Sequence, residues 1–457
     1  MADGAANRES GATHSDGGDG GALKRVISGK LLLLFILGDM IGGGVYVLVG
    51  EVSLETGGAV WTAFLAAFVL ALLTAGSYAE LVTKYPRAAG AALYVHKAFK
   101  IQFVTFIVAF LVMSSGITSA AALAKAFAGD YFSEFLEAPQ LLVSLLFLGA
   151  LFLINMRGIS ESVKTNAVFT IIEVAGLLLI IVIGVFALGG GSADVGRTLE
   201  FKQGATPIGA IIAGVTIAFY ALIGFEDAVN VAEETEDPSR VFPRALFGAM
   251  LLAGVVYLAV TLISVMVVDL KTLGASDAPL LEVVKAGPVD IPPLFFSGIA
   301  LFAVANGALI NMIMASRIVY GMASQGIVPT VFARVLPGRR TPWVAIVFTT
   351  ALCAALIITG DLGVLADTTV MLLLIVFTIV NISVLMLRRD PVDHDHFTTP
   401  TFAPVLGAAV SLFLVTQNEA EIYLRAGIIV VIALVFWVIN AASPGERREM
   451  DAEAFSG

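Results

Sequence analysis

Long apolar runs recur along the whole chain and are separated by short polar segments. Each run holds few or no charged residues and is roughly 17 to 25 residues long, which is the length that a helix needs to cross ~30 Å of hydrocarbon. The pattern therefore predicts an all-α membrane protein with about twelve transmembrane helices. The predicted helices are 31–50, 59–82, 101–124, 139–156, 164–188, 208–231, 244–268, 293–316, 342–359, 364–387, 401–416 and 422–442.

The composition agrees with a chain that is solvated by lipid. Apolar residues make up 58 % of the 457 residues and charged residues only 14 %, whereas about a quarter of a typical soluble domain is charged. The single cysteine, Cys353, lies in an apolar run. An intramolecular disulfide is therefore excluded.

Basic residues are distributed unequally between the two sets of alternate loops. Since Lys and Arg near helix ends are retained on the cytoplasmic side, the richer set is predicted to be cytoplasmic. This assignment places both termini in the cytoplasm of a multi-pass protein of the plasma membrane. All but six of the 26 basic residues belong to the cytoplasmic set, and the exceptions are Lys125, Arg197, Lys202, Lys271, Lys285 and Arg425.

The two ends of the chain lack the apolar pattern. Residues 1–22 are rich in Gly, Ala and Asp without periodicity, which predicts a disordered cytoplasmic tail. Residues 443–457 predict a short cytoplasmic C-terminal tail. The membrane domain is therefore expected at 23–442.

Two of the predicted helices are interrupted, and they are five helices apart. Three glycines follow one another at 42–44 in the first helix, where each costs about 1 kcal/mol relative to alanine. In the sixth helix, Gly224 is followed by two acids, Glu226 and Asp227. Corresponding interruptions in two halves of a chain indicate an inverted repeat.

The interruptions predict a central binding site. Irregular backbone at membrane depth is tolerated where it lines protein or a watery cavity, because lipid cannot satisfy free amide groups. Half-helix N-termini suit an anion such as a carboxylate, and exposed carbonyls suit ammonium or a metal cation. A small zwitterion satisfies both. The alternative is that the glycines at 42–44 only permit close helix packing, although packing glycines are usually spaced by four.

Five short motifs occur in order along the chain. They are Ile41-Gly42-Gly43-Gly44-Val45-Tyr46, Tyr85-Pro86-Arg87-Ala88-Ala89-Gly90-Ala91-Ala92-Leu93-Tyr94, Asn155-Met156-Arg157-Gly158, Gly224-Phe225-Glu226 with Glu233-Glu234-Thr235-Glu236-Asp237-Pro238, and Ser316-Arg317 with Tyr320 and Thr341-Pro342. With these motifs the sequence resembles the amino acid–polyamine–organocation superfamily of permeases, from about residue 31 to residue 440.

The resemblance implies a fold and a mechanism. The fold would be a five-plus-five inverted repeat with broken helices 1 and 6, plus two extra helices. The repeats would cover about 31–188 and 208–387, and the extra helices 401–442, within a twelve-helix transporter domain. The substrate would cross by alternating access around a site near the bilayer midplane.

The resemblance also assigns substrate-binding roles at the two interruptions. The backbone N–H groups at 42–44 would hold a substrate carboxylate, and the carbonyls of Met40, Tyr220 and Ile223 would accept an α-ammonium group. Tyr220 matches the aromatic residue that covers the substrate in the arginine–agmatine exchanger. That exchanger has a serine where this chain has Gly43, so one side-chain contact is lost. The predicted binding set is Met40, Ile41, Gly42, Gly43, Gly44, Phe219, Tyr220 and Ile223.

Acidic residues inside the predicted helices are candidates for ion coupling by H⁺ or Na⁺. Asp39, Glu173 and Glu226 stand out, because an ionised carboxylate at the bilayer centre costs at least ~2.5 kcal/mol and needs a partner, a cavity or a proton. Glu226 matches a glutamate linked to proton coupling in the exchanger. Glu173 has an alternative as a neutral structural acid, and Asp39 as a helix cap. Asp227 is a fourth, less deeply placed acid, and Glu80 is expected to face water.

The predicted function is secondary active transport of a cationic or neutral amino acid, by proton- or sodium-coupled symport. Two alternatives stay open, an amino acid/amine exchanger and a polyamine transporter. A channel or facilitator fits less well, because the acids cluster at two breaks and do not follow a continuous pore.

Other classes of function lack their sequence signals. No histidine lies within a predicted helix, and no phosphate-binding loop ending in Lys-Ser or Lys-Thr occurs, so catalysis and direct use of ATP are not expected. A basic patch for nucleic acid is also missing. No cofactor or metal site is predicted. The expected partners are an amino acid or amine substrate and the lipid bilayer, and the sequence leaves the oligomeric state open.

Overall fold

The described part of the chain is helical along most of its length in a computed structural model. The structure describes residue 25 and residues 27–86, 90–157, 163–324, 326–336 and 341–442. The tails predicted at 1–22 and 443–457 lie outside the described residues, as do parts of the motifs at 85–94 and 155–158.

Each of the twelve predicted helices is found within the described part of the chain. Seven helices are long and apolar enough to cross a bilayer, and one bent pair makes an eighth. The seven are α3 (Val60–Lys84), α5 (Gln102–Phe127), α8 (Val163–Gly190), α10 (Pro238–Val267), α13 (Pro293–Ser324), α15 (Leu362–Leu387) and α17 (Ala420–Ala442), and the bent pair is α1 (Gly29–Ile41) with α2 (Gly44–Thr56). Four shorter apolar helices complete the set, namely α7 (Gln140–Met156), α9 (Pro207–Tyr220), α14 (Trp343–Thr359) and α16 (Phe402–Val415).

Several helices extend beyond the predicted limits. The apolar pattern starts one helix at 244, but α10 begins at Pro238. In the same way α13 continues past 316 to Ser324. Arginines interrupt the apolar pattern at both places, yet arginine is a good helix former. Hydropathy therefore marks the apolar part of each helix and not the whole helix.

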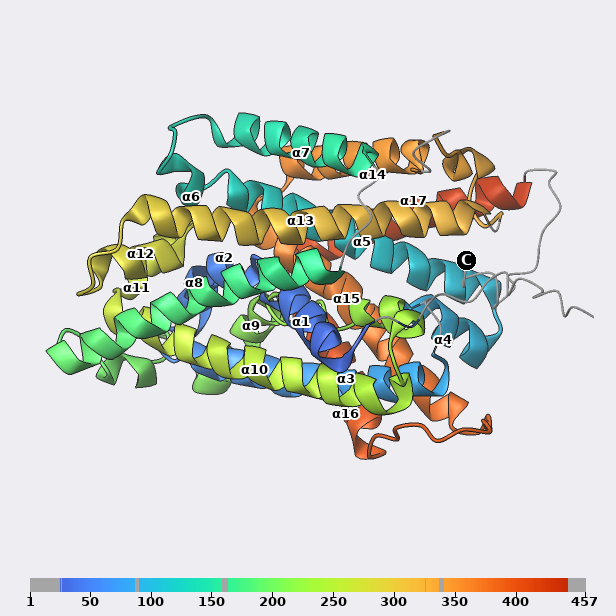
Figure 1. The fold of residues 1–457 in the computed structure, drawn as a ribbon, viewed down its shortest axis with the longest axis horizontal. Coiled ribbons are helices and arrows are strands. Elements are labelled where there is room, and N and C mark those ends of the chain that lie inside the picture. The colour runs from blue at the N-terminus through green and yellow to red at the C-terminus, as the bar shows by residue number, and fades with distance from the viewer. Residues whose placement is uncertain are drawn as a thin grey trace, which may run out of the picture.

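The broken helices lie in the middle of the bundle. Figure 1 shows the long helices side by side along the molecule, with α1, α2 and α9 surrounded by the others. α1 packs against α8 and α10, α2 packs against α9, and α5 packs against α13 and α15. Short elements join the spans at the two ends, namely α4 (Gly90–Phe99), α6 (Asp130–Ser133), α11 (Leu270–Ala275), α12 (Pro279–Ala286) and the 3₁₀ turns η1 (Gly196–Leu199), η2 (Asp227–Glu234) and η3 (Thr330–Ala333).

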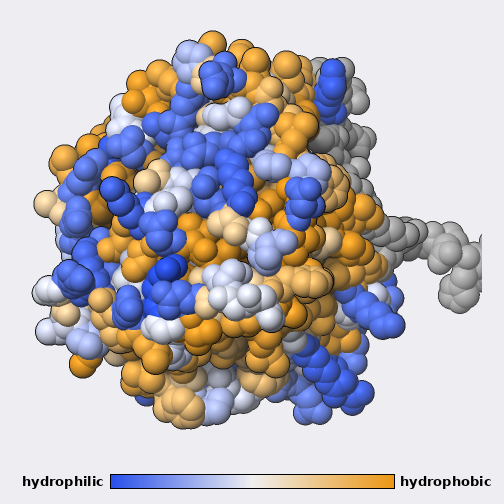
Figure 2. Space-filling model, turned by 90° about the vertical axis from the view of Figure 1, so that its left-hand side faces the viewer, coloured by the Kyte–Doolittle hydropathy of each residue, from blue (hydrophilic) through white to orange (hydrophobic). Residues whose placement is uncertain are grey.

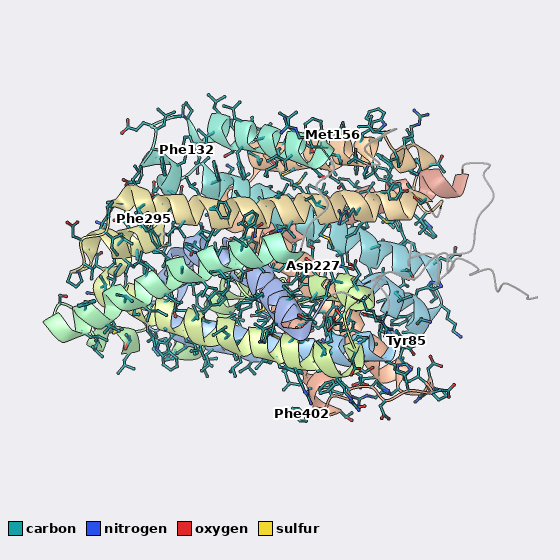
Figure 3. All side chains as sticks on the ribbon, viewed as in Figure 1. Tyr85, Phe132, Met156, Asp227, Phe295 and Phe402 are labelled. Carbon is teal, nitrogen blue, oxygen red and sulfur yellow. The ribbon has the colours of Figure 1, made fainter. Side chains whose placement is uncertain are left out.

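The surface divides into polar ends and an apolar belt. Figure 2 shows the end that carries α11 and α12, where hydrophilic residues gather over the middle and apolar residues form much of the rim. The side chains of Phe295 and Phe402 point outward (Figure 3) and are 61 % and 65 % exposed. Large exposed apolar residues of this kind suit contact with lipid acyl chains.

The expectation that Glu80 faces water is wrong. Glu80 is 2 % exposed, and both of its carboxylate oxygens accept hydrogen bonds from Arg388, at 2.8 and 2.7 Å. The N–H group of Thr399 donates a third bond of 2.9 Å. The reason is that the segment after α15 folds back over the end of α3 and covers it.

Candidate binding site at the two helix breaks

The first break separates α1 from α2. α1 ends at Ile41, α2 begins at Gly44, and the two helices are bent by 42°. The N–H group of Gly44 donates to the carbonyl of Gly42, which is two residues back and not the four of an α-helix. The successive glycines, which are unfavourable in a helix, therefore lie in an unwound segment.

The second break follows α9. Thr206 caps the start of this helix by accepting from the N–H group of Gly209, with Pro207 in the first turn, and the helix ends at Tyr220. A turn then leads into η2 at Asp227. Gly224 has a φ of +114°, which residues with a Cβ atom rarely adopt.

The two breaks touch each other. A Cβ atom placed on Gly224 would lie 2.9 Å from the carbonyl carbon and oxygen of Asp39. A Cβ atom on Gly44 would lie 2.9 Å from the Cα atom of Ala221. The glycines thus allow two backbones to approach more closely than any larger residue permits. The prediction that interruptions in helices 1 and 6 occur and come together is confirmed.

A cavity of about 60 Å³ lies between the breaks. Since a buried water needs roughly 10 to 15 Å³ by the same measure, the cavity has room for a few small groups. It is lined by Asp39, Met40, Gly42, Gly44, Val112, Ser115, Gly116, Ser119, Leu123, Tyr220, Ile223, Gly224, Glu226, Asp227, Gly307, Asn311, Met314, Ala315, Ile318, Thr369 and Leu373.

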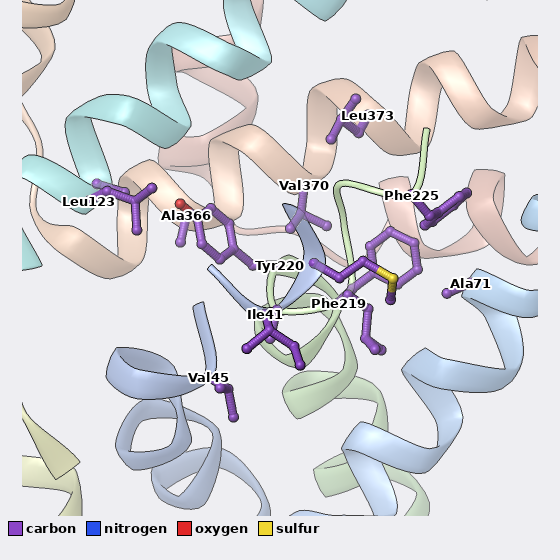
Figure 4. Packing of buried hydrophobic residues seen from close by; sticks show 14 of the residues in the cluster. Ile41, Val45, Ala71, Leu123, Phe219, Tyr220, Phe225, Ala366, Val370 and Leu373 are labelled. Carbon is purple, nitrogen blue, oxygen red and sulfur yellow. The ribbon is translucent and has the colours of Figure 1, made fainter. Parts of the chain in front are cut away.

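Most of the predicted site residues line this cavity, and a few lie behind it. Ile41 and Phe219 belong to the buried apolar cluster shown in Figure 4. Gly43 packs against Leu123 and Val304, so a Cβ atom there would require the Leu123 side chain to shift. The predicted residues that line the cavity are Asp39, Met40, Gly42, Gly44, Tyr220, Ile223 and Glu226.

Several backbone groups predicted to bind substrate already have partners within the chain. The N–H group of Gly42 donates to the carbonyl of Gly38 at 3.2 Å. The carbonyl of Met40 accepts from the hydroxyl of Tyr257 at 2.6 Å. A substrate that used these groups would therefore have to replace existing hydrogen bonds in this conformation.

Glu226 holds the second break in shape. Its Oε2 atom accepts a 2.9 Å hydrogen bond from the N–H group of Gly224, and the side chain is 8 % exposed. Because hydrogen bonds to an ionised acceptor are about twice as strong as neutral ones, the protonation state of this carboxyl group affects how firmly the Gly224 turn is held.

Glu173 lies apart from the cavity. Its Oε1 atom accepts from the side-chain amide of Asn306 at 3.1 Å, while its backbone carbonyl accepts from the hydroxyl of Tyr46 at 2.6 Å. Its Oε2 atom is buried without a hydrogen-bond partner among the residues that the structure describes. The structure thus brings Asp39 and Glu226 together at the breaks but not Glu173.

Sequence reasoning missed the polar side chains that α5, α13 and α15 contribute to the cavity. The hydroxyl oxygen of Ser119 lies 2.8 Å from the hydroxyl oxygen of Tyr220. Ser115, Asn311 and Thr369 also line the cavity. Several hydroxyl side chains lie close together at 114–119 within an apolar run. This is the sequence signal that could have indicated that α5 lines the cavity.

The comparison with known proteins decides the family. Residues 27–439 match the amino acid permease family. The chain belongs to this family. The resemblance inferred from the motifs is therefore confirmed, and the matched region covers the described helices from α1 to α17 almost completely.

Relatives of this permease family member carry several different names. This chain is 28 % identical over 330 residues to a chloroplastic cationic amino acid transporter of Arabidopsis thaliana. The alignment covers 67 % of this chain and 56 % of the relative. The chain is 29 % identical to a low-affinity putrescine importer of Escherichia coli, over 82 % of this chain and 84 % of the relative. A branched-chain amino acid permease of Bacillus subtilis is 24 % identical, over 92 % and 91 %.

The alignment with the plant relatives is partial. The chain spans 56 % of the chloroplastic transporter and 64 % of a vacuolar cationic amino acid transporter of the same plant. The match to the two bacterial proteins extends over most of both chains.

Proposed function

We propose that this protein is a secondary active transporter that moves an amino acid or a related amine across the cell membrane by alternating access. The observation that carries the proposal is the cavity between two mutually contacting helix breaks, α1–α2 and α9–η2. Unwound backbone supplies amide and carbonyl groups that lipid cannot satisfy. The family match and the relatives named as transporters, importers or permeases support the same function.

The charges around the cavity favour a cationic substrate. Asp39, Glu226 and Asp227 line it, and no Lys, Arg or His does so among the described residues. An acidic surplus in a low-dielectric site attracts positive charge. A cationic amino acid or a polyamine agrees with the names of the plant and Escherichia coli relatives. A neutral amino acid is the second candidate, supported by the branched-chain permease.

Glu226 is the proposed coupling group, with H⁺ as the coupling ion. Protonation would weaken its hydrogen bond to Gly224 and so link the charge on the carboxyl group to the shape of the break. Glu173 is the second candidate, with H⁺ or Na⁺, because one of its oxygen atoms is buried without a partner among the described residues.

The proposal also includes the membrane location of the protein and its internal repeat. The unequal distribution of basic residues supports a location in the plasma membrane with both ends of the chain in the cytoplasm. The two halves, 31–188 and 208–387, form the inverted repeats, and 401–442 forms the additional pair of helices.

Uptake into proteoliposomes tests the proposal directly. Radiolabelled arginine, lysine, putrescine and leucine are offered while a pH gradient and a Na⁺ gradient are imposed separately. Saturable accumulation of a cationic compound driven by the pH gradient is expected. Failure of every compound to accumulate under either gradient, or flux that does not saturate, would contradict secondary active transport. Accumulation of leucine alone would overturn the cationic assignment and leave the transporter class intact.

A further inference from the structure

A second recess lies at the end of the bundle that carries most of the basic residues. It has a volume of about 970 Å³ and is formed where α4 leads into α5, opposite the end of α15. α4 and α5 pack against each other and against α15, so the recess is formed by elements that contact one another. It shares no residue with the cavity between the helix breaks.

Positive charge dominates this recess. Lys97, Lys100 and Arg389 line it together with His96, and Asp390 is the one acid in the lining among the residues that the structure describes. Asp390 offsets one of these positive charges, and its carboxylate also accepts a 2.6 Å hydrogen bond from the hydroxyl of Tyr85.

The cations of the recess form no ion pairs among the described residues. Lys97 lies over the ring of Tyr85, 5.0 Å from its centroid, which leaves its ammonium group able to meet a ligand. Three cations against one acid leave the lining of this recess net positive, which indicates a site for an anion.

The corner between α4 and α5 is shaped by Lys100. Lys100 has a φ of +56°, a left-handed conformation that costs roughly 1 kcal/mol or more for a residue with a Cβ atom. Its N–H group donates to the carbonyl of His96 at 2.8 Å. The chain thus turns sharply and keeps a lysine where glycine or asparagine would be easier to accommodate.

Apolar side chains border the same recess. Ile382, Leu385 and Met386 line it, and Ile382 and Met386 are about 40 % exposed. Phe103, next to the lining residue Gln102, packs edge-on against Trp437 at 5.4 Å. Tryptophan concentrates at the level of lipid headgroups, so the recess opens where headgroups meet acyl chains.

We propose that this recess binds the headgroup of an anionic phospholipid. The phosphate would lie against Lys97, Lys100 and Arg389, and an acyl chain would follow Ile382 and Met386. The ligand is a lipid and not free phosphate because the basic recess is continuous with exposed apolar side chains. The basic end is also the one predicted to face the cytoplasm, whose leaflet is rich in anionic lipids. This site is independent of the proposed transport function.

Lipid retention by the full-length protein tests the site. Detergent-purified protein is titrated with phosphatidylglycerol, with phosphatidylcholine of the same acyl chains and with inorganic phosphate, and bound molecules are counted by native mass spectrometry. We expect the protein to retain one phosphatidylglycerol in preference to phosphatidylcholine. The double variant Lys97→Gln/Lys100→Asn should bind phosphatidylglycerol roughly 30-fold more weakly, since each positive charge contributes about fivefold. Asparagine is chosen because it tolerates a positive φ.

The matched control is Lys30→Gln/Arg240→Gln. It removes the same charge from exposed positions at the same end of the bundle, outside the recess, and should retain the lipid as the wild type does. Arg389→Gln, an exposed position, serves as a further variant if the double variant fails to fold, and about fivefold weaker binding is expected. Equal weakening by the control, equal retention of phosphatidylcholine, or occupancy by inorganic phosphate without lipid preference would overturn the proposal.

Discussion

Gly224 and Gly42 both lie at the helix breaks but have different surroundings. Gly224 has a φ of +114°. A Cβ atom on it would lie 2.9 Å from the carbonyl carbon and oxygen of Asp39. Gly42 has ordinary negative φ, and the nearest atom to a Cβ would be 3.5 Å away. The first position therefore requires glycine, while the second tolerates alanine.

A pair of alanine variants tests this difference. Gly224→Ala should lower the free energy of unfolding by about 1 to 3 kcal/mol, because the strained backbone and the close contact both oppose a Cβ atom. Gly42→Ala should change it by no more than about 0.5 kcal/mol. Thermal unfolding of the purified proteins, followed by tryptophan fluorescence, measures both. Similar midpoints for the two variants would show that the breaks are less closely packed than described.

The carboxyl group of Glu226 can be tested by removing its charge. Glu226→Gln removes the charge but keeps an oxygen atom that can accept from Gly224, so the fold should persist. Accumulation driven by a pH gradient should fall at least tenfold, as is typical when a proton-transferring group is lost, while exchange of labelled for unlabelled substrate continues. Glu173→Gln is the matched control, because it makes the same change outside the cavity. Loss of accumulation only in Glu173→Gln would move the coupling role to that residue.

Hydrogen bonds join the end of α3 to the segment after α15. Glu80 receives two hydrogen bonds from Arg388 and one from Thr399, and Lys84 donates to the carbonyl of Leu387 at 2.6 Å. α3 and α15 therefore cannot separate at this end without exposing or leaving unpaired a buried carboxylate.

Breaking this pair should destabilise the protein measurably. Arg388→Ala should lower the free energy of unfolding by about 2 to 3 kcal/mol, less than the ~3 to 5 kcal/mol of a fully buried pair, because the arginine side chain is 23 % exposed. Arg240→Ala is the control, since its side chain is 80 % exposed and lies 4.0 Å from Asp237. It should have an effect within about 0.5 kcal/mol. Thermal unfolding and limited proteolysis after α15 provide the measurements. Equal effects of the two variants would contradict the buried pair.

The sequence predicts these elements well but not their contacts across the bundle. Length and hydropathy indicate each span, and successive glycines at 42–44 and the Gly224 turn indicate both breaks, because each is a local property of the chain. The burial of Glu80 and the contributions of Ser119 and Asn311 to the cavity depend on which helices become neighbours. Such contacts join residues more than a hundred positions apart, as Ser119 and Tyr220 show, and no local pattern specifies them.

At the scale of the whole molecule, the small size of the cavity is informative. A space of about 60 Å³ admits a few water-sized groups but not an amino acid with a long side chain. Transport of such a substrate requires the helices around the breaks to move apart. The longer helices α5, α13 and α15 also line the cavity, so motion of these helices relative to the broken ones would enlarge it.

Thiol labelling can detect that motion. A cysteine at position 115, introduced as Ser115→Cys on α5, should react with a small water-soluble maleimide while the transporter cycles, and bound substrate should slow the reaction several-fold. Ser144→Cys, at a fully buried position on α7, is the control and should stay unreactive. Labelling of both variants at one rate, unaffected by substrate, would argue against a substrate-occupied cavity.

Cys353, the one cysteine of the chain, lies within α14 with 0 % exposure. Its thiol is therefore shielded from reagents in water as long as the bundle stays folded. Spectroscopic probes that attach through cysteine need a background without accessible thiols. Because the one native thiol is buried, spin labels and fluorophores can be attached at cysteines that are introduced into the otherwise native chain.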